Sequence, residues 1–159
     1  MTWIKPNFLW MMYRNGWGTK EAQECVLAIH MKLDAFKKYL ESSVYSSYNE
    51  RLGISREEWQ EQVKESSVRI QWDPDHDPFG NKLERRAIQI GLRGDFIRSF
   101  AKDDLILIED ISDFVREQHQ FVLNDHLDNL NIPSEKPLLF DDENLNKKLR
   151  IQSCAIVAK

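Results

Sequence analysis

"SVRIQWDPDHDPFGNKLERRAIQIGL", residues 67–92, carries the pattern that decides the fold. Apolar and polar side chains alternate through Ser67–Asp73 and again through Arg86–Leu92, which is typical of strands with one buried face. The prolines and the glycine of residues 74–82 mark a long turn between these strands. The sequence therefore predicts a pair of half-buried strands at the centre of the chain.

Other helices and strands are predicted on both sides of this pair. Strands are expected at Glu24–Leu33 and, as a buried run, at Asp104–Asp110; helices are expected at Phe8–Arg14, Asp34–Leu40, Ser55–Glu65, 93–102 and Ser112 to about Leu127. Because strands and helices mix without a strict βαβ rhythm, the predicted class is α+β, with a small mixed or antiparallel sheet core and flanking helices.

The apolar pattern of the strands also predicts how the elements pack. We expect the strands around Val26, Ile70, Ile88 and Ile106 to share one core, covered by the helix that follows Ser112.

The ends of two helices carry recognisable signals. Asn7 can accept a hydrogen bond from a free amide at the start of the first helix, and Gly16 can end that helix in a left-handed conformation. Ser55 and Glu58 have the spacing of a capping box.

The length of 159 residues predicts one domain. Such a chain buries roughly 70% of its unfolded surface and needs no disulfide or metal to hold a core. We expect a core domain over residues 1–130 and an irregular tail over residues 131–159, where the sequence signals are weak.

Composition excludes several classes of protein. The longest nearly apolar run, Phe8–Tyr13, is far shorter than the ~20 residues that span a membrane. Cys25 and Cys154 are far apart and fit reduced thiols, so we expect a cytoplasmic protein. The acids of residues 73–77 fit turn caps better than metal ligands, so no metal is predicted.

Aromatic and basic residues dominate the opening segment, where no acid precedes Glu21 although the chain has a net charge of −4. Guanidinium and ammonium groups hold phosphates, and indole rings stack on bases. These properties predict a substrate-binding site for an anionic ligand, formed by Lys5, Trp10, Arg14, Trp17 and Lys20. The alternative is that the aromatic residues are core and the cations are solvated rim.

Three further residues join this predicted site. Arg93 lies at a strand-to-helix turn, where free amides also attract anions. Asp73 and Glu109 each end a strand, so either could supply a catalytic carboxylate as general base or ribose contact. Acids crowd residues 103–143, which argues against nucleic acid wrapping around the whole surface.

The opening run "MTWIKPNFLWMMYRNGWGTKEAQECVLAI" resembles domain-of-unknown-function family 4291. The runs "VRIQWDPDHD", "AIQIGLRGDFIRSF" and "LILIED" match the later blocks of that family in order, so the resemblance covers roughly residues 1–115. Members of the family carry a few dozen residues before this block. From this we expect the chain as given to be less stable than a version with such a segment, since a missing strand leaves an exposed sheet edge.

The resemblance implies no established activity. By analogy of topology alone, the opening of full-length members is similar to that of ADP-ribosyltransferases, which bind NAD between two small sheets. The expected function is binding of a nucleotide-like anion, NAD or an RNA end, by a transferase. The alternative is a non-catalytic module that binds protein or nucleic acid.

Overall fold

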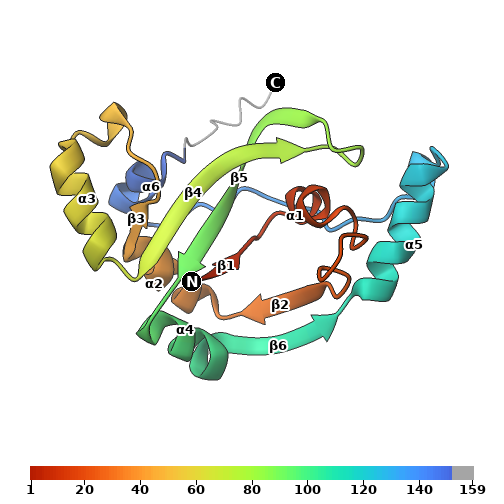
Figure 1. The fold of residues 1–159 in the computed structure, drawn as a ribbon, viewed down its shortest axis with the longest axis horizontal. Coiled ribbons are helices and arrows are strands. Elements are labelled where there is room, and N and C mark those ends of the chain that lie inside the picture. Colours follow the sequence, from red (N-terminus) through yellow and green to blue (C-terminus); the bar gives the residue numbers. More distant parts are fainter. Residues whose placement is uncertain (152–159) are drawn as a thin grey trace.

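The computed structural model describes residues 1–151 and confirms the α+β class (Figure 1). Its strands are β1 (Thr2–Ile4), β2 (Leu27–Met31), β3 (Ser43–Tyr45), β4 (Val68–His76), β5 (Lys82–Leu92) and β6 (Leu105–Asp110). Its α-helices are α1 (Phe8–Asn15), α2 (Leu33–Glu41), α3 (Arg56–Glu65), α4 (Asp95–Ser99), α5 (Ser112–Leu123) and α6 (Glu143–Leu149). Short 3-10 turns lie at Glu50–Leu52 and Leu127–Asn129, and a π-helical turn spans Phe100–Asp104.

The predicted central pair is the antiparallel hairpin β4–β5, in which Ile70 lies opposite Ile90. Both strands are longer than expected. β4 runs on through Pro74 to His76, and β5 begins at Lys82. A shift of register between Pro74 and His76 accommodates the proline, which has no N–H to give to the ladder. The hairpin is the centre of a mixed four-stranded sheet in the order β1-β5-β4-β3, in which β3 runs parallel to β4.

The prediction of one common sheet core is wrong for the strands near Val26 and Ile106. β2 and β6 form a separate two-stranded antiparallel sheet, which is visible along the lower rim in Figure 1. The expected burial of β6 is also wrong, since Ile106 is 67% exposed and Leu107 and Ile108 are each 49% exposed. Local apolar character identified the strand but did not determine what covers it.

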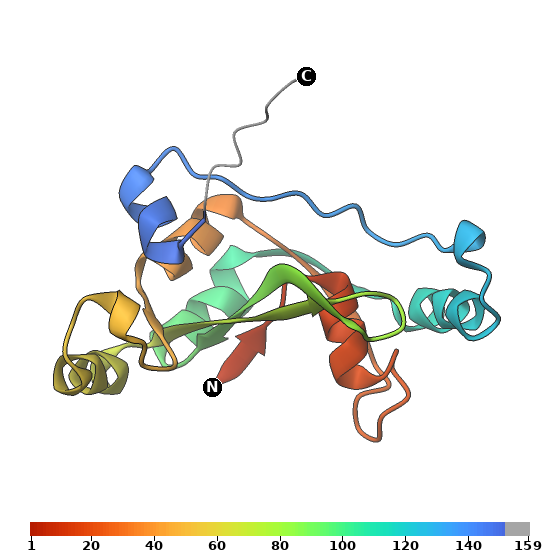
Figure 2. The same cartoon turned by 90° about the horizontal axis from the view of Figure 1, so that it is seen from above.

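The main core lies on one face of the four-stranded sheet, the apolar face, which carries Ile70 and Ile90. Helices α2 and α6 cover this face, as Figure 2 shows. The tail was expected to be irregular, but its residues 143–149 form α6, whose Leu145 and Leu149 are 3% and 1% exposed within this core. A seven-residue helix has little propensity signal of its own, and packing on the sheet stabilises it.

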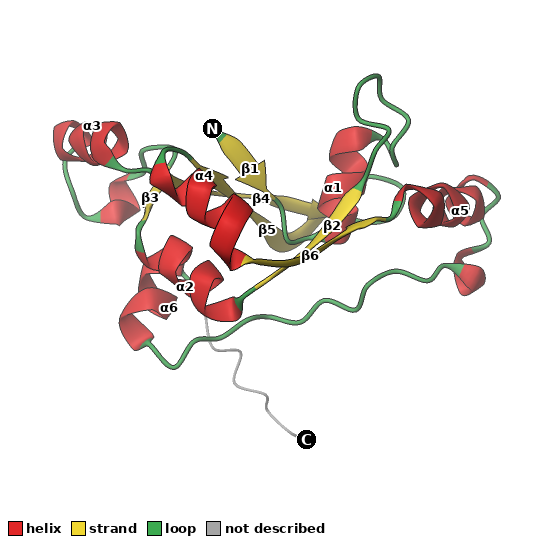
Figure 3. Cartoon of the chain, turned by 90° about the horizontal axis from the view of Figure 1, so that it is seen from below, coloured by secondary structure: helices red, strands yellow, loops and turns green. Residues whose placement is uncertain are grey.

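A second core joins α1 to α5 at the other end of the molecule. Leu9, Met12 and Trp17 pack there against Val115 and Val122. The helix after Ser112 therefore packs on α1 instead of covering the sheet, which corrects the prediction (Figure 3).

An extended segment, residues 130–142, connects the region after α5 to α6, and we call it the strap. Figure 2 shows it crossing the whole molecule above the apolar face. Within residues 1–151, none of the helices has the length and apolar character to cross a bilayer.

Candidate functional site

The opening segment brings two cations to the same indole ring. Helix α1 carries Trp10 and Arg14 one turn apart, and the Arg14 guanidinium lies 6.0 Å from the Trp10 ring centre. Lys5, in the turn between β1 and α1, places its Nζ 6.0 Å from the same ring. We call Lys5 and Arg14 the cation pair. Together with Trp10 they are predicted site residues that lie close together in the structure.

The electrostatics of the pair are unfavourable in the free protein. Burial lowers the pKa of Lys5, and the neighbouring positive charge of Arg14 lowers it further. Among the residues that the structure describes, neither cation forms an ion pair with a carboxylate. Within residues 1–151, the one hydrogen bond of the Lys5 ammonium goes to the Trp3 carbonyl oxygen, at 3.4 Å. This site therefore has positive charge that its own side chains leave unbalanced.

The face of the sheet opposite the apolar face carries polar side chains, and we call it the polar face. Asp73 accepts hydrogen bonds there from Gln71 at 2.9 Å and from Gln89 at 2.8 Å. Strand β1 ends at Ile4, opposite Ile90, and Lys5 follows directly in the turn to α1. The register places Trp3, opposite Gly91, on the face that carries Gln89 and Asp73.

Trp3 is a residue of this face that was not among the predicted site residues. It lies opposite Gly91, where a Cβ would approach the Trp3 ring to 3.1 Å, so the glycine lets the indole lie close to the sheet. Trp3 is only partly buried. The pairing of Trp3 with Gly91 joins residues far apart in the chain, so no local sequence signal pointed to it.

The structure does not open the predicted stacking rings to solvent. Trp10 and Trp17 are 4% and 7% exposed, so neither offers a free face to a base. Trp17 donates its Nε1–H to the Pro78 carbonyl oxygen at 3.2 Å and stacks on His119. Lys20 stays close to the pair, because its ammonium donates to the Arg14 carbonyl oxygen at the end of α1.

Arg93 is engaged elsewhere and does not complete the site. Its Nε donates to the Ser66 carbonyl oxygen at 2.9 Å, and its Nη2 donates to that of Lys64, at the end of α3. Along β5 it lies four residues from Gln89, roughly 13 Å at about 3.3 Å per residue. The expectation that Arg93 joins Lys5 and Arg14 is corrected by these contacts.

Glu109 lies on the other sheet. Its carboxylate pairs with His30 across the β2–β6 ladder, and both side chains are about half exposed. Of the two predicted catalytic carboxylates, Asp73 lies in the same sheet as β1, the strand that leads into Lys5, and Glu109 does not.

Comparison with known proteins identifies the family. A family model described as a domain of unknown function (DUF4291) matches residues 1–138. The chain belongs to this family. No curated protein and no solved structure matches the chain.

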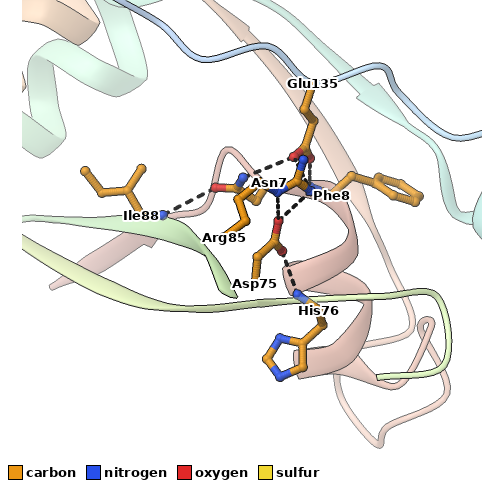
Figure 4. Close-up of polar contacts among 7 residues, drawn as sticks. All are labelled: Asn7, Phe8, Asp75, His76, Arg85, Ile88 and Glu135. Carbon is orange, nitrogen blue, oxygen red and sulfur yellow. Dashed lines mark hydrogen bonds and ion pairs between the residues drawn. The ribbon is translucent and has the colours of Figure 1, made fainter. Parts of the chain in front are cut away.

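A buried ionic network in this DUF4291 chain was not predicted (Figure 4). Asp75 is fully buried, and both its Oδ2 contacts come from Arg85, with Nε at 2.8 Å and Nη2 at 2.6 Å. Arg85 Nη2 also lies 3.5 Å from Glu135 of the strap. Within residues 1–151, no group of three metal-ligating side chains occurs.

Glu135 takes the capping role that was expected of Asn7. Its Oε1 accepts from the Phe8 amide at 2.6 Å, and its Oε2 accepts from Asn7 Nδ2 at 3.1 Å (Figure 4). The Asn7 side chain makes no cap and accepts from the Ile88 amide at 3.3 Å instead. No local signal reveals this, because Glu135 is 127 residues from Phe8.

His76 lies at the edge of the same network. It is 3% exposed and stacks on Tyr13 with ring centres 3.6 Å apart. Neither ring nitrogen has a hydrogen-bond partner among the residues that the structure describes. In sequence His76 resembled a turn residue, and the extension of β4 is what buries it.

Proposed function

We propose that this protein binds a nucleotide-like anion, NAD or the phosphorylated end of an RNA, with the phosphate held by Lys5 and Arg14. One observation carries the proposal: the two cations flank the Trp10 ring without an ion-pair partner in the described chain.

Electrostatics explain why an anion suits this place. Two like charges beside a buried ring repel each other, and partial burial deprives Lys5 of water. A phosphate relieves both penalties, since it pairs with the ammonium and with the planar fork of the guanidinium. Lys20 stands at the end of α1 and adds a third positive charge to the field.

The polar face supplies groups for the rest of the ligand. Trp3 replaces the buried rings of Trp10 and Trp17 as the surface on which a base stacks. Asp73 would accept a ribose hydroxyl or act as general base, with its orientation fixed by Gln71 and Gln89. In this proposal the protein is a transferase, and Glu109 has no part in it.

The alternative function is a non-catalytic module for protein or nucleic acid. It is favoured by the absence, among the residues that the structure describes, of any ion pair joining Asp73 to Lys5 or Arg14. We also propose a cytoplasmic location, because Cys25 is an exposed free thiol. Cys154 lies outside the described residues.

A thermal-shift screen tests the function. ADP, NAD and a short 5′-phosphorylated RNA should each be tried on the wild type, on Arg14→Gln and on the control Arg116→Gln, whose side chain lies exposed on α5. Stabilisation of the wild type and the control, but not of Arg14→Gln, supports the proposal. Equal behaviour of all three proteins refutes it.

Asp73→Asn then separates the two functions. If the protein is a transferase, Asp73→Asn should keep its affinity for the stabilising nucleotide and lose turnover. If it is a binding module, neither the wild type nor Asp73→Asn should show turnover.

A further inference from the structure

A cavity of about 460 Å³ lies on the apolar face. This volume is within the range of small-molecule sites, roughly 300–1,000 Å³. Its wall is mainly apolar and comes from the sheet, the two helices α2 and α6, the strap, and Pro6 and Asn7 in the turn between β1 and α1. The apolar lining includes Phe36, Leu40, Trp72, Ile88, Leu138 and Leu149.

The architecture explains why this space exists. Along the apolar face, the pair Ile70–Ile90 is fully covered by α2 and α6, whereas the next pair, Trp72–Ile88, is only partly buried. At this second pair the layer above the sheet is the strap, a single extended chain. A helix is about 10 Å wide and an extended chain about half of that, so the strap does not fill the layer that the helices fill.

Charge is arranged at one end of the cavity. The next pair along the strands is Pro74–Arg86, and Arg86 and Lys136 of the strap both line the cavity and are exposed. Neither forms an ion pair within the part of the chain that the structure describes, and Arg86 is held at the cavity by a hydrogen bond from its Nη2 to the Trp72 carbonyl oxygen at 2.5 Å. The lining carboxylate, Glu135, is already engaged with Phe8, Asn7 and Arg85.

We propose that this cavity binds an amphipathic carboxylate, with its hydrocarbon chain along the Trp72–Ile88 pair and its head at Arg86 and Lys136. The apolar wall provides the free energy through burial of the chain. The unpaired cations select a negative head over a neutral one. This site is separate from the proposed nucleotide-binding site, because none of Lys5, Trp10 and Arg14 lines the cavity.

Three probes of defined chemistry test both parts of the proposal by calorimetry. Decanoate has the head and the chain, decanol has the chain alone, and acetate has the head alone. We expect decanoate to bind at least about tenfold more tightly than decanol, and acetate to show no binding. Equal affinities for decanoate and decanol, or no binding of decanoate below its micellar concentration, would overturn the proposal.

Variants then assign the binding to this cavity. Arg86→Gln should weaken decanoate about tenfold and leave decanol unchanged, and Leu138→Ser should weaken both. Arg116→Gln on α5 is the matched charge control and should change neither. Leu138 and Arg86 are exposed, so melting temperatures near that of the wild type should accompany these effects. Unchanged decanoate affinity in both cavity variants would refute the assignment.

Discussion

Replacing Glu135 by alanine should reveal how strongly the strap holds the opening helix. The carboxylate accepts from the Phe8 amide and from Asn7, and it lies near Arg85, with its side chain 23% exposed. Loss of a helix cap costs about 1 kcal/mol, and loss of a hydrogen bond to a charged group costs about 1.5–3 kcal/mol. Because these contacts are partly exposed and not additive, we expect a total loss of about 2–4 kcal/mol in the free energy of unfolding.

Glutamine at the same position separates shape from charge. Its carbonyl oxygen can still accept from the Phe8 amide, but its NH₂ then faces the donors of Asn7 and Arg85. We therefore expect Glu135→Gln to cost about half as much as Glu135→Ala. Ser134→Ala, an exposed neighbour on the strap, is the control and should stay within about 0.5 kcal/mol of the wild type.

Urea denaturation followed by circular dichroism measures these differences, and thermal melts should agree with a fall of roughly 5–15 °C for the alanine variant. A loss below about 0.5 kcal/mol in Glu135→Ala would show that the strap does not support α1. Equal losses in the alanine and glutamine variants would show that the retained acceptor at Phe8 contributes nothing.

Four further outcomes are expected. Arg14→Lys keeps the charge and loses the fork, so calorimetry should show ADP binding about tenfold weaker or more with little change in melting temperature. Because an anion reverses the lowering of the Lys5 pKa, ADP binding at alkaline pH below the ordinary pKa of lysine should take up protons, and its enthalpy should vary with the ionisation enthalpy of the buffer. Burial and the hydrogen bond to Asp104 raise the pKa of Tyr39, so its neutral form stabilises the fold below pH 10 and this contribution is lost as the pH rises further. In Tyr39→Phe, urea titrations at pH 8 and pH 11 should therefore show a smaller alkaline loss than in the wild type. Asp75→Asn removes the buried partner of a guanidinium and should cost about 3–5 kcal/mol in urea titrations, and a loss under 1 kcal/mol would contradict the buried-network description.

Local features of the fold were predictable from the sequence because their causes are local. The Ser55 hydroxyl does accept from the Glu58 amide at 3.1 Å, and Gly16 does end α1 with φ of 60°. The alternation around Ile70 and Ile90 gave the right strands and the right buried face. In each case neighbours within a few residues decide the conformation.

The partition into two sheets was not predictable in this way. Residues 105–108 form a continuous apolar run, which is typical of a buried strand. The strand is exposed because it pairs only with β2 and no further strand of the described chain joins that sheet. Helix α6 and the Glu135 cap also depend on partners more than a hundred residues away. For the candidate site, the contact of Arg14 with Trp10 followed from helical spacing, whereas the burial of Trp10 and the engagement of Arg93 required the tertiary structure.

The distance along the chain between Phe8 and its cap has a consequence for synthesis. The first helix leaves the ribosome early, but the carboxylate that completes it follows 127 residues later. At about 5–20 residues per second this delay is roughly 6–25 s. For most of this interval Leu9 and Met12 also lack their partners on α5, so the most apolar segment of the chain stays exposed. Nascent chains of this protein should therefore depend on chaperones until the strap has emerged.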